Sequence, residues 1–288
     1  MATLPRLPEG KWADFPEEMR NQYLAMYQDG YDGMMDELKR AQDEVRHDEC
    51  NLSRPKADFP EQGKEALIKE HAVLMYSADY LFQRVYGKDG SPKFSCHSNG
   101  NLNPKNTNPT CVPDEVLLNM QPVFQIRHPG LMFSSLARAE NDVNMGTGPQ
   151  DPRCRVFFTL EFSRQLYEWY LNTPGAPTPK VISADDIMTE PAVVRKLCEE
   201  VGMDPDELQY EWETREAPEG KEQMKRFAST IYASKGILPG YDSKNFDMEK
   251  KRKEWKEYWG EEGGEFLAKS VEDALPDYEW LMERRVRL

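Results

Sequence analysis

The chain has 288 residues, of which 39% are hydrophobic, so it is long enough and apolar enough to bury the core of one large α/β domain. Its formal net charge of −14 argues against a broad surface for nucleic acid or anionic membranes, because attraction to phosphate dominates such binding. The sequence has no apolar run long enough to cross a membrane and no apolar signal core at its start, which predicts a cytoplasmic protein.

The first predicted element is a long helix over residues 15–45. Its apolar side chains recur at intervals of three and four residues, which is the period of one helix face. This apolar stripe consists of Tyr23, Met26, Tyr27, Tyr31, Met34, Met35 and Leu38. A core face and a dimer face both fit the stripe. The core is the more frequent explanation, but an exposed patch of this size also predicts a homodimer through residues 23–38.

Three short apolar runs are predicted to form the strands of a parallel sheet. They are residues 65–69, 121–126 and 180–183. Helices are predicted over residues 73–86, from near Met132, over 155–171 and over 189–201. Thr189 is the expected N-cap of the last of these helices, and Gly202 is expected to end it. Strands that alternate with helices are typical of α/β proteins with a parallel sheet.

Longer connections complete the predicted organisation. Two loops are predicted, a polar one over residues 87–114 and a second one over residues 141–154. A connection as long as the first is often a lid, a binding loop or a disordered segment. Two charged helices are predicted within residues 240–288. We expect a single domain over residues 1–288, with an N-terminal helical arm over 1–48.

The five cysteines do not predict a metal site. Their odd number and wide spacing argue against both a disulfide framework and a zinc site. Cys96 and Cys111 flank the polar loop and are a pair that oxidation would join, although disulfides are rare inside cells.

Polar side chains follow all three predicted strands. They are Lys69, Glu70, His71, Arg127, His128, Asp185 and Asp186. In open parallel sheets, ligands bind at the carboxyl ends of the strands. Because histidine titrates near neutral pH, His71 and His128 are candidate acid/base groups, with Glu70 or Asp185 to orient them. The alternative is a structural role, in which Arg127 pairs with Asp185 and ties two strand ends together.

Arg127 and Ser135 form a spacing that suits a phosphate. Arg127 ends the second predicted strand, and Ser135 lies eight positions later in the first turns of the following helix. A guanidinium and a hydroxyl near a helix N-terminus both favour a phosphate group. The segment PVFQIRHPGLMFSSLARAE resembles the motif with which sulfotransferases hold the 3′-phosphate of their donor PAPS. Arg127 and Ser135 match the Arg and the Ser of that motif.

The resemblance to the sulfotransferase family covers the chain from about residue 20 onward. The segments GKEALIKEHA, RVFFTLEFSRQLYEWYL, VISADDIMTEPAVVRKLCEEVGMDP and DALPDYEWLMERR are similar to fungal and bacterial members. The resemblance implies a P-loop-type α/β fold. It also aligns residues 229–236, which include Lys235, with the family's C-terminal donor-binding loop. Together with Lys69 at the first strand end, the candidate anion-binding residues are Lys69, Arg127, Ser135 and Lys235.

The sequence departs from the family pattern at its N-terminus. The family opens with a strand and a loop rich in Gly, Ser and Thr, whose backbone N–H groups cradle the 5′-phosphosulfate of the donor. No such pattern precedes the long helix. We therefore expect a reduced three-layer parallel sheet of the sulfotransferase type without its first strand and loop, and no PAPS-dependent sulfonation. The sheet edge left open would be covered by residues 1–45 or by a second subunit.

Three functions are compatible with these features. The first is an enzyme that uses no cofactor and acts on a small molecule, such as a polyketide intermediate, by cyclisation, dehydration or hydrolysis. The second is a PAPS-dependent sulfotransferase whose N-terminus is truncated. The third is a non-catalytic binding or assembly protein, which the apolar stripe supports.

Overall fold

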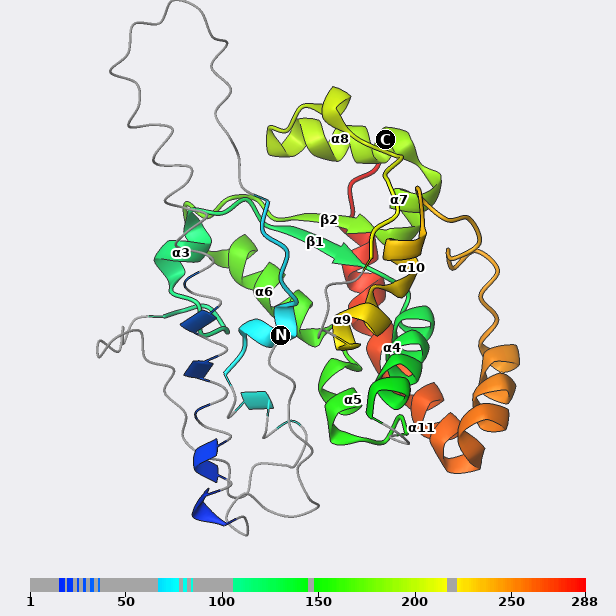
Figure 1. Ribbon diagram of the computed structural model, residues 1–288. Helices are drawn as coiled ribbons and strands as arrows, with labels where there is room; N and C mark the ends of the chain where they lie inside the picture. The colour runs from blue at the N-terminus through cyan, green and yellow to red at the C-terminus, as the bar shows by residue number, and fades with distance from the viewer. Residues whose placement is uncertain are drawn as a thin grey trace, which may run out of the picture. The chain divides into compact units, whose positions relative to one another are not determined.

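The computed structural model (Figure 1) describes a large part of the chain. The described residues are 67–77, 106–144, 148–216 and 222–288, with the separate positions 16–18, 20–22, 25, 28, 29, 32, 33, 36, 80, 81 and 84. Contacts divide the chain into two compact units, residues 1–114 and residues 115–288, and each unit is described by itself. The prediction of one domain over residues 1–288 therefore stays a prediction. Among the described residues, no helix is both long and apolar enough to cross a membrane.

Helical structure in the first unit agrees with the predicted N-terminal helix. Every described position between residues 17 and 36 is helical. The apolar stripe from Tyr23 to Leu38 lies outside the described residues, so the choice between a core face and a dimer face stays open. Cys96 also lies outside them, and its pairing with Cys111 remains a prediction.

The first predicted strand is wrong for the part that the structure describes. Residues 67–69 form no strand, and the side chain of Leu67 is 85% exposed. The chain instead enters a short 3-10 helix, η3 (Ala72–Met75), in which the Leu74 N–H donates to the His71 carbonyl over 2.8 Å. An apolar run of this length becomes a strand only when another strand pairs with it, and no described residue does so.

The helix predicted over residues 73–86 is interrupted. After η3, helical structure returns at the described positions 80, 81 and 84, where the Leu81 N–H donates to the Ser77 carbonyl over 3.1 Å. Residues 106–113 form a loop, as predicted, and the Asp114 carboxylate orders it by accepting hydrogen bonds from the Thr107 and Asn108 N–H groups over 2.8 and 3.1 Å. Helix α3 (Asp114–Leu118) follows at once.

The second unit contains a two-stranded parallel sheet, which confirms the other two predicted strands. Strand β1 (Val123–Ile126) pairs with β2 (Lys180–Ser183), with Val123 opposite Lys180 and Ile126 opposite Ser183. The two arrows lie side by side and point the same way in Figure 1. Along the other side of β2, the Val286 N–H donates to the Val181 carbonyl over 2.9 Å. The fold is thus helix-rich with a small parallel sheet, which is compatible with the α/β class, whereas the three-layer sulfotransferase-type sheet stays a prediction.

Helices make up most of the second unit. They are α4 (Pro129–Asn144), α5 (Pro152–Phe157), α6 (Glu161–Asn172), α7 (Ala184–Thr189), α8 (Pro191–Val201), η4 (Pro205–Glu207), α9 (Glu222–Phe227), α10 (Ser229–Ala233) and α11 (Met248–Glu283). The helix predicted over residues 155–171 is two helices, because the Thr159 hydroxyl accepts the Glu161 N–H over 3.0 Å and starts α6 anew. The loop predicted over residues 141–154 is shorter, since α4 and α5 extend into it.

The ends of α8 are close to those predicted. The N-cap is Glu190 and not Thr189, because Thr189 belongs to α7, where its hydroxyl donates to the Asp185 carbonyl over 2.9 Å. Gly202 ends α8 with φ of 83°, a left-handed conformation that favours glycine. This agrees with its predicted place.

Helix α11 consists of two helical segments, as predicted for the C-terminal region. They meet at Gly260, where φ is 77° and ψ is 171°. Gly264 of the second segment lies close to the backbone of the first segment. A Cβ atom at this position would lie only 2.4 Å from the backbone nitrogen of Lys256. Helix α11 packs against α4, α6, β1 and β2.

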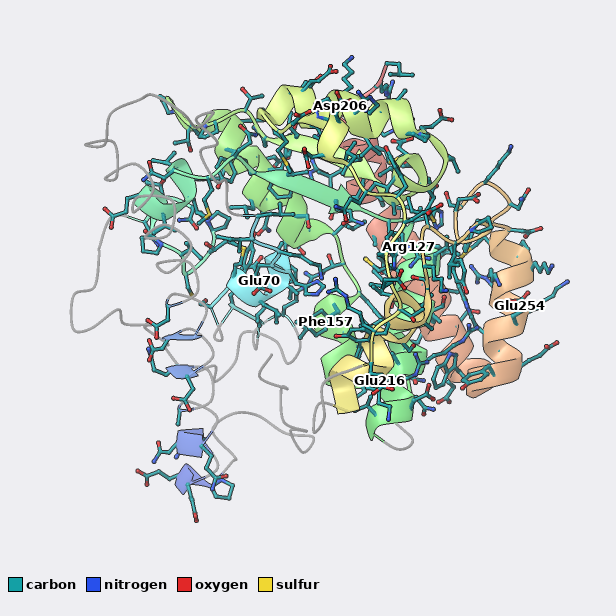
Figure 2. The ribbon with its side chains drawn as sticks, turned by 45° about the horizontal axis from the view of Figure 1, so that its top comes forward. Glu70, Arg127, Phe157, Asp206, Glu216 and Glu254 are labelled. Carbon is teal, nitrogen blue, oxygen red and sulfur yellow. The ribbon has the colours of Figure 1, made fainter. Side chains whose placement is uncertain are left out.

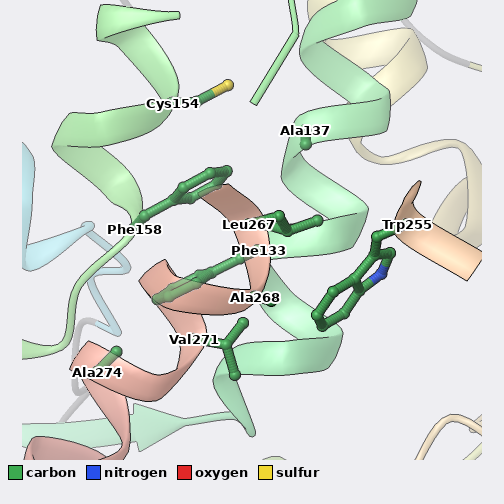
Figure 3. Close-up of a cluster of buried hydrophobic side chains, with 9 residues drawn as sticks. All are labelled: Phe133, Ala137, Cys154, Phe158, Trp255, Leu267, Ala268, Val271 and Ala274. Atoms are coloured by element: carbon green, nitrogen blue, oxygen red, sulfur yellow. The ribbon is translucent and has the colours of Figure 1, made fainter. Parts of the chain in front are cut away.

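A cluster of buried apolar side chains joins α4, α5 and α11 (Figure 3). Phe133 of α4 is fully buried and stacks on Phe158, with the ring centroids 4.9 Å apart. Trp255, Leu267 and Val271 of α11 are also fully buried. Burial of each large side chain stabilises the fold by roughly 1.5–3 kcal/mol. The cluster therefore fixes the start of α4, and with it the residues that link β1 to α4.

Candidate anion-binding site at the strand ends

Two of the three predicted polar groups lie at the same edge of the sheet. Ile126 and Ser183 are opposite each other at the ends of β1 and β2. Arg127 and His128 follow the first of these residues, and Asp185 comes two positions after the second. Figure 2 labels Arg127 where β1 ends. The parallel register thus places the start of α4 beside the start of α7, the edge at which α/β proteins bind ligands.

Asp185 is held by hydrogen bonds that the sequence did not predict. Its carboxylate accepts the Ser243 N–H over 3.1 Å and the Ser243 hydroxyl through a second, short hydrogen bond. Its own N–H donates to the hydroxyl of Ser183, the N-cap of α7, over 3.2 Å. The carboxylate is therefore oriented by a residue from the loop that precedes α11.

Tyr278 of α11 completes this network. Its side chain is 7% exposed, and its hydroxyl lies near the side chains of Ser243 and Ser183. Burial and the nearby Asp185 carboxylate raise the pKa of Tyr278, although the two serines act in the opposite direction. The hydroxyl therefore keeps its proton at neutral pH and remains a hydrogen-bond donor.

His128 lies at the N-terminus of α4 as a neutral ring. Its Nδ1 atom accepts the Gly130 N–H over 3.1 Å, which requires that Nδ1 carries no proton. Burial lowers the pKa of His128, and Asp185 raises it by a smaller amount. The ring also contacts Phe246 and Tyr278, at centroid distances of 4.3 and 5.4 Å. The single proton is therefore on Nε2, so His128 is arranged to donate a hydrogen bond, and a role as proton acceptor requires it to release Gly130.

The described residues accept hydrogen bonds from only some of the N–H groups of the Arg127 guanidinium. One terminal nitrogen donates to the Tyr241 carbonyl over 3.2 Å. The Nε atom is buried and has no hydrogen-bond partner among the described residues. The ion pairs of the described residues do not include one between Arg127 and Asp185, so the predicted structural alternative is not observed. The neighbouring Asp186 instead pairs with Arg285 over 3.0 Å.

The other two predicted anion ligands of this unit are exposed. Ser135 lies on the exposed face of α4, whereas the adjacent Ser134 is buried and donates to the Gly130 carbonyl over 2.8 Å. The side chain of Lys235 is exposed, and its carbonyl accepts the Trp212 N–H over 3.0 Å beside a bridge between Glu211 and Gly236. The predicted anion-binding roles of Ser135 and Lys235 remain predictions.

Lys69, Glu70 and His71 belong to the first unit. The His71 N–H donates to the Glu70 carboxylate over 2.6 Å. The pKa of His71 is lowered, first by partial desolvation from the surrounding protein and then by Lys69, while Glu70 raises it. His71 is thus neutral at pH 7. The predicted roles of these three residues remain predictions.

Sequence reasoning missed Ser183, Ser243, Tyr278 and Phe246. One of them carried a usable signal, because a serine just before Asp185 and Asp186 is typical of a helix N-cap. The others come from a loop and a helix far along the chain, and no spacing links them to β1 or β2.

Comparison with known proteins identifies the family. Two curated relatives are sulfotransferases named ppzF, from Metarhizium rileyi (strain RCEF 4871) and Metarhizium majus (strain ARSEF 297). Each is 30% identical over 241 residues, which cover 78% of this chain and 71% of the relative. No family model and no solved structure matches the chain. The chain belongs to the sulfotransferase family, as the motif at Arg127 predicted.

Proposed function

We propose, in place of the sequence-based expectation of no PAPS-dependent sulfonation, that this protein is a sulfotransferase that binds PAPS at the ends of β1 and β2 and transfers its sulfonate to a small molecule. One observation carries the proposal: the guanidinium of Arg127 has a buried Nε without a partner, next to the N-terminus of α4. A guanidinium with an unused donor at a helix N-terminus favours a phosphate group. Ser135, further along α4, is the proposed second ligand of that phosphate.

The reaction proposed for this site is a direct transfer. The oxygen of an acceptor hydroxyl forms a bond to sulfur, and the bond between sulfur and the bridging phosphate oxygen breaks. Its electron pair stays on the phosphate, and the hydroxyl proton passes to a base. The Nε2–H group of His128 suits stabilisation of negative charge on an oxygen. His71 of the first unit remains the predicted base, and its lowered pKa leaves it neutral and able to accept a proton.

A second candidate is chemistry without a donor, such as cyclisation, dehydration or hydrolysis of a polyketide-like molecule. The observation that favours it is the network of Asp185, Ser243, Tyr278 and Ser183. A carboxylate that is oriented by two donors, beside a tyrosine that keeps its proton, provides both partners for acid/base chemistry. This candidate predicts turnover without PAPS.

Sulfonate transfer distinguishes the two candidates. The purified chain is incubated with labelled PAPS and a panel of phenols and alcohols, and the same panel plus polyketide-like compounds is incubated without PAPS. The main proposal predicts label in the acceptor. It also predicts that Arg127→Met lowers donor affinity by about 10- to 150-fold, since a hydrogen bond to a charged group contributes roughly 1.5–3 kcal/mol.

Two adjacent serines give a matched control for that experiment. Ser135→Ala should weaken donor binding, whereas Ser134→Ala, which removes a hydroxyl bonded only within α4, should not. His71→Gln should abolish turnover with little effect on the melting temperature. Turnover of a polyketide-like compound without PAPS, together with no label transfer, would establish the second candidate and exclude the first.

A further inference from the structure

The segment of residues 237–246, here called the strap, is attached to the rest of the protein mainly by side chains. It lies between the bridge at Gly236 and Asp247, the N-cap of α11. Among the described residues, no backbone-to-backbone hydrogen bond joins residues 237–245 to another element. At Gly240 the strap turns with φ of 82°, a conformation that favours glycine. A segment without ladder hydrogen bonds opens at a lower free energy than the elements it covers.

The strap contacts three strand-end residues that were predicted as site residues. The Tyr241 carbonyl accepts a hydrogen bond from Arg127, and Ser243 donates two hydrogen bonds to Asp185. The ring of Phe246 lies against the His128 ring. Arg127 and His128, which are the residues of this set able to donate a hydrogen bond to an anionic ligand, are thus contacted by the chain itself.

Gly130 makes the fit of the strap possible. A Cβ atom at this position would lie 2.2 Å from Cζ of Phe246. Gly130 is the second residue of α4, and its missing side chain provides the space that the Phe246 ring occupies. Any larger residue at position 130 therefore requires the Phe246 ring to shift.

We infer that the strap inhibits the site, because Tyr241 competes with an anionic ligand for Arg127 and must be displaced before that ligand binds fully. A phosphate group carries negative charge and is able to accept two parallel hydrogen bonds from a guanidinium, whereas the neutral Tyr241 carbonyl accepts one, so a phosphorylated ligand is able to displace Tyr241. The apparent affinity equals the affinity of the open form multiplied by the fraction of molecules that are open. The identity of the ligand rests on the proposed function, whereas the shielding of Arg127 does not.

The test uses Gly130→Ala in the 288-residue chain, which keeps a helix-compatible residue and displaces the Phe246 ring. Phenylglyoxal modification, followed by mass spectrometry, measures the reactivity of Arg127. The exposed Arg195 is the internal reference, and Phe227→Ala, which alters an exposed side chain of α9, is the control variant. We expect Arg127 to react about tenfold faster in Gly130→Ala, corresponding to about 1.4 kcal/mol of strap opening.

Two further variants keep the test decisive. Ser243→Ala opens the strap without a change in α4, so it replaces Gly130→Ala if that variant does not fold. In Gly130→Ala/Phe246→Ala the clash is absent, so its Arg127 reactivity should equal that of Phe246→Ala alone. If the double variant instead adds the two effects, the clash is not the cause and the inference is overturned.

The affinity for adenosine 3′,5′-bisphosphate, the desulfonated form of PAPS, is measured by calorimetry on the same variants. A rise of about threefold to tenfold in Gly130→Ala supports competition by the strap. Unchanged Arg127 reactivity, or equal nucleotide affinity in wild type and Gly130→Ala, overturns it. Faster Arg127 modification with no nucleotide binding in either protein supports the shielding by the strap and contradicts the proposed function.

Discussion

The core cluster around α4 and the ends of strands β1 and β2 are held by different forces. The core cluster consists of apolar side chains, among them Phe133 and Trp255, which pack against one another across α4, α5 and α11. The strand ends are held by side-chain hydrogen bonds, in which Asp185 and Ser243 each depend on the other. Apolar packing depends on volume and is not directional, whereas each polar partner is needed in one place. We therefore expect the core to contribute more to the stability of the second unit than the hydrogen bonds at the strand ends.

The largest effect on stability should come from the core. Phe133→Ala removes a fully buried ring that stacks on Phe158, and we expect the free energy of unfolding to fall by about 3–5 kcal/mol. Urea denaturation followed by circular dichroism measures this change. Leu171→Ala is the control, because that side chain is 51% exposed and its loss should cost much less. Equal effects of the two substitutions would show that the cluster does not support the fold.

A smaller effect is expected from the polar network. Asp185→Ala leaves the N–H and hydroxyl groups of Ser243 without their acceptor, and we expect a loss of about 1–3 kcal/mol. Asp185→Asn retains one acceptor oxygen and should cost less. The same urea experiment applies to both variants. A loss for Asp185→Ala as large as that for Phe133→Ala would contradict the distinction between core and strand ends.

His128 should make stability depend on pH. Its folded-state pKa is lowered by burial, so the unfolded chain binds a proton at a pH where the folded ring stays neutral. Unfolding then takes up protons, and the free energy of unfolding falls as the pH decreases below about 6.5, the ordinary histidine value. His128→Gln should remove part of this slope. The difference between wild type and variant from pH 7 to pH 5 measures it. A difference that grows in the opposite direction would mean that the folded state binds the proton more tightly, which conflicts with the bond between Gly130 and Nδ1.

The smallest effect on stability is expected from Ser135, the second residue proposed to bind the phosphate. Ser135 is exposed, so Ser135→Ala should change the free energy of unfolding by no more than about 0.5 kcal/mol. Donor affinity should nevertheless fall. Thermal denaturation with and without nucleotide measures both quantities. A large loss of stability with unchanged affinity would assign Ser135 to the scaffold.

The sequence predicted those elements that local patterns determine. Strands β1 and β2 were recognised as short apolar runs, and Gly202 was recognised as a helix end, because each depends on a few neighbouring residues. The run over residues 65–69 has the same local character, yet its described part is not a strand. Strand formation depends on a partner that the run itself does not specify. The division between α5 and α6 was missed because Thr159, which is neither Gly nor Pro, starts the new helix.

Only the residues of the candidate site that directly follow the strands were predictable from the sequence. Arg127, His128 and Asp185 follow strand ends, and the parallel topology brings such residues together. Their partners could not be derived, since Ser243 lies 58 positions from Asp185 and Tyr278 still further along the chain. The tautomer of His128 likewise follows from one contact with Gly130 and not from the residue type.

Calorimetric titration of adenosine 3′,5′-bisphosphate into wild-type protein and into Arg127→Met tests the central proposal most directly. Arg127 is the proposed ligand of the nucleotide phosphate, and its buried Nε has no other partner among the described residues. We predict saturable binding to the wild type and an affinity about 10- to 150-fold lower in the variant, at an unchanged melting temperature of the free protein. Equal affinity in the two proteins, or no binding to the wild type, would contradict it.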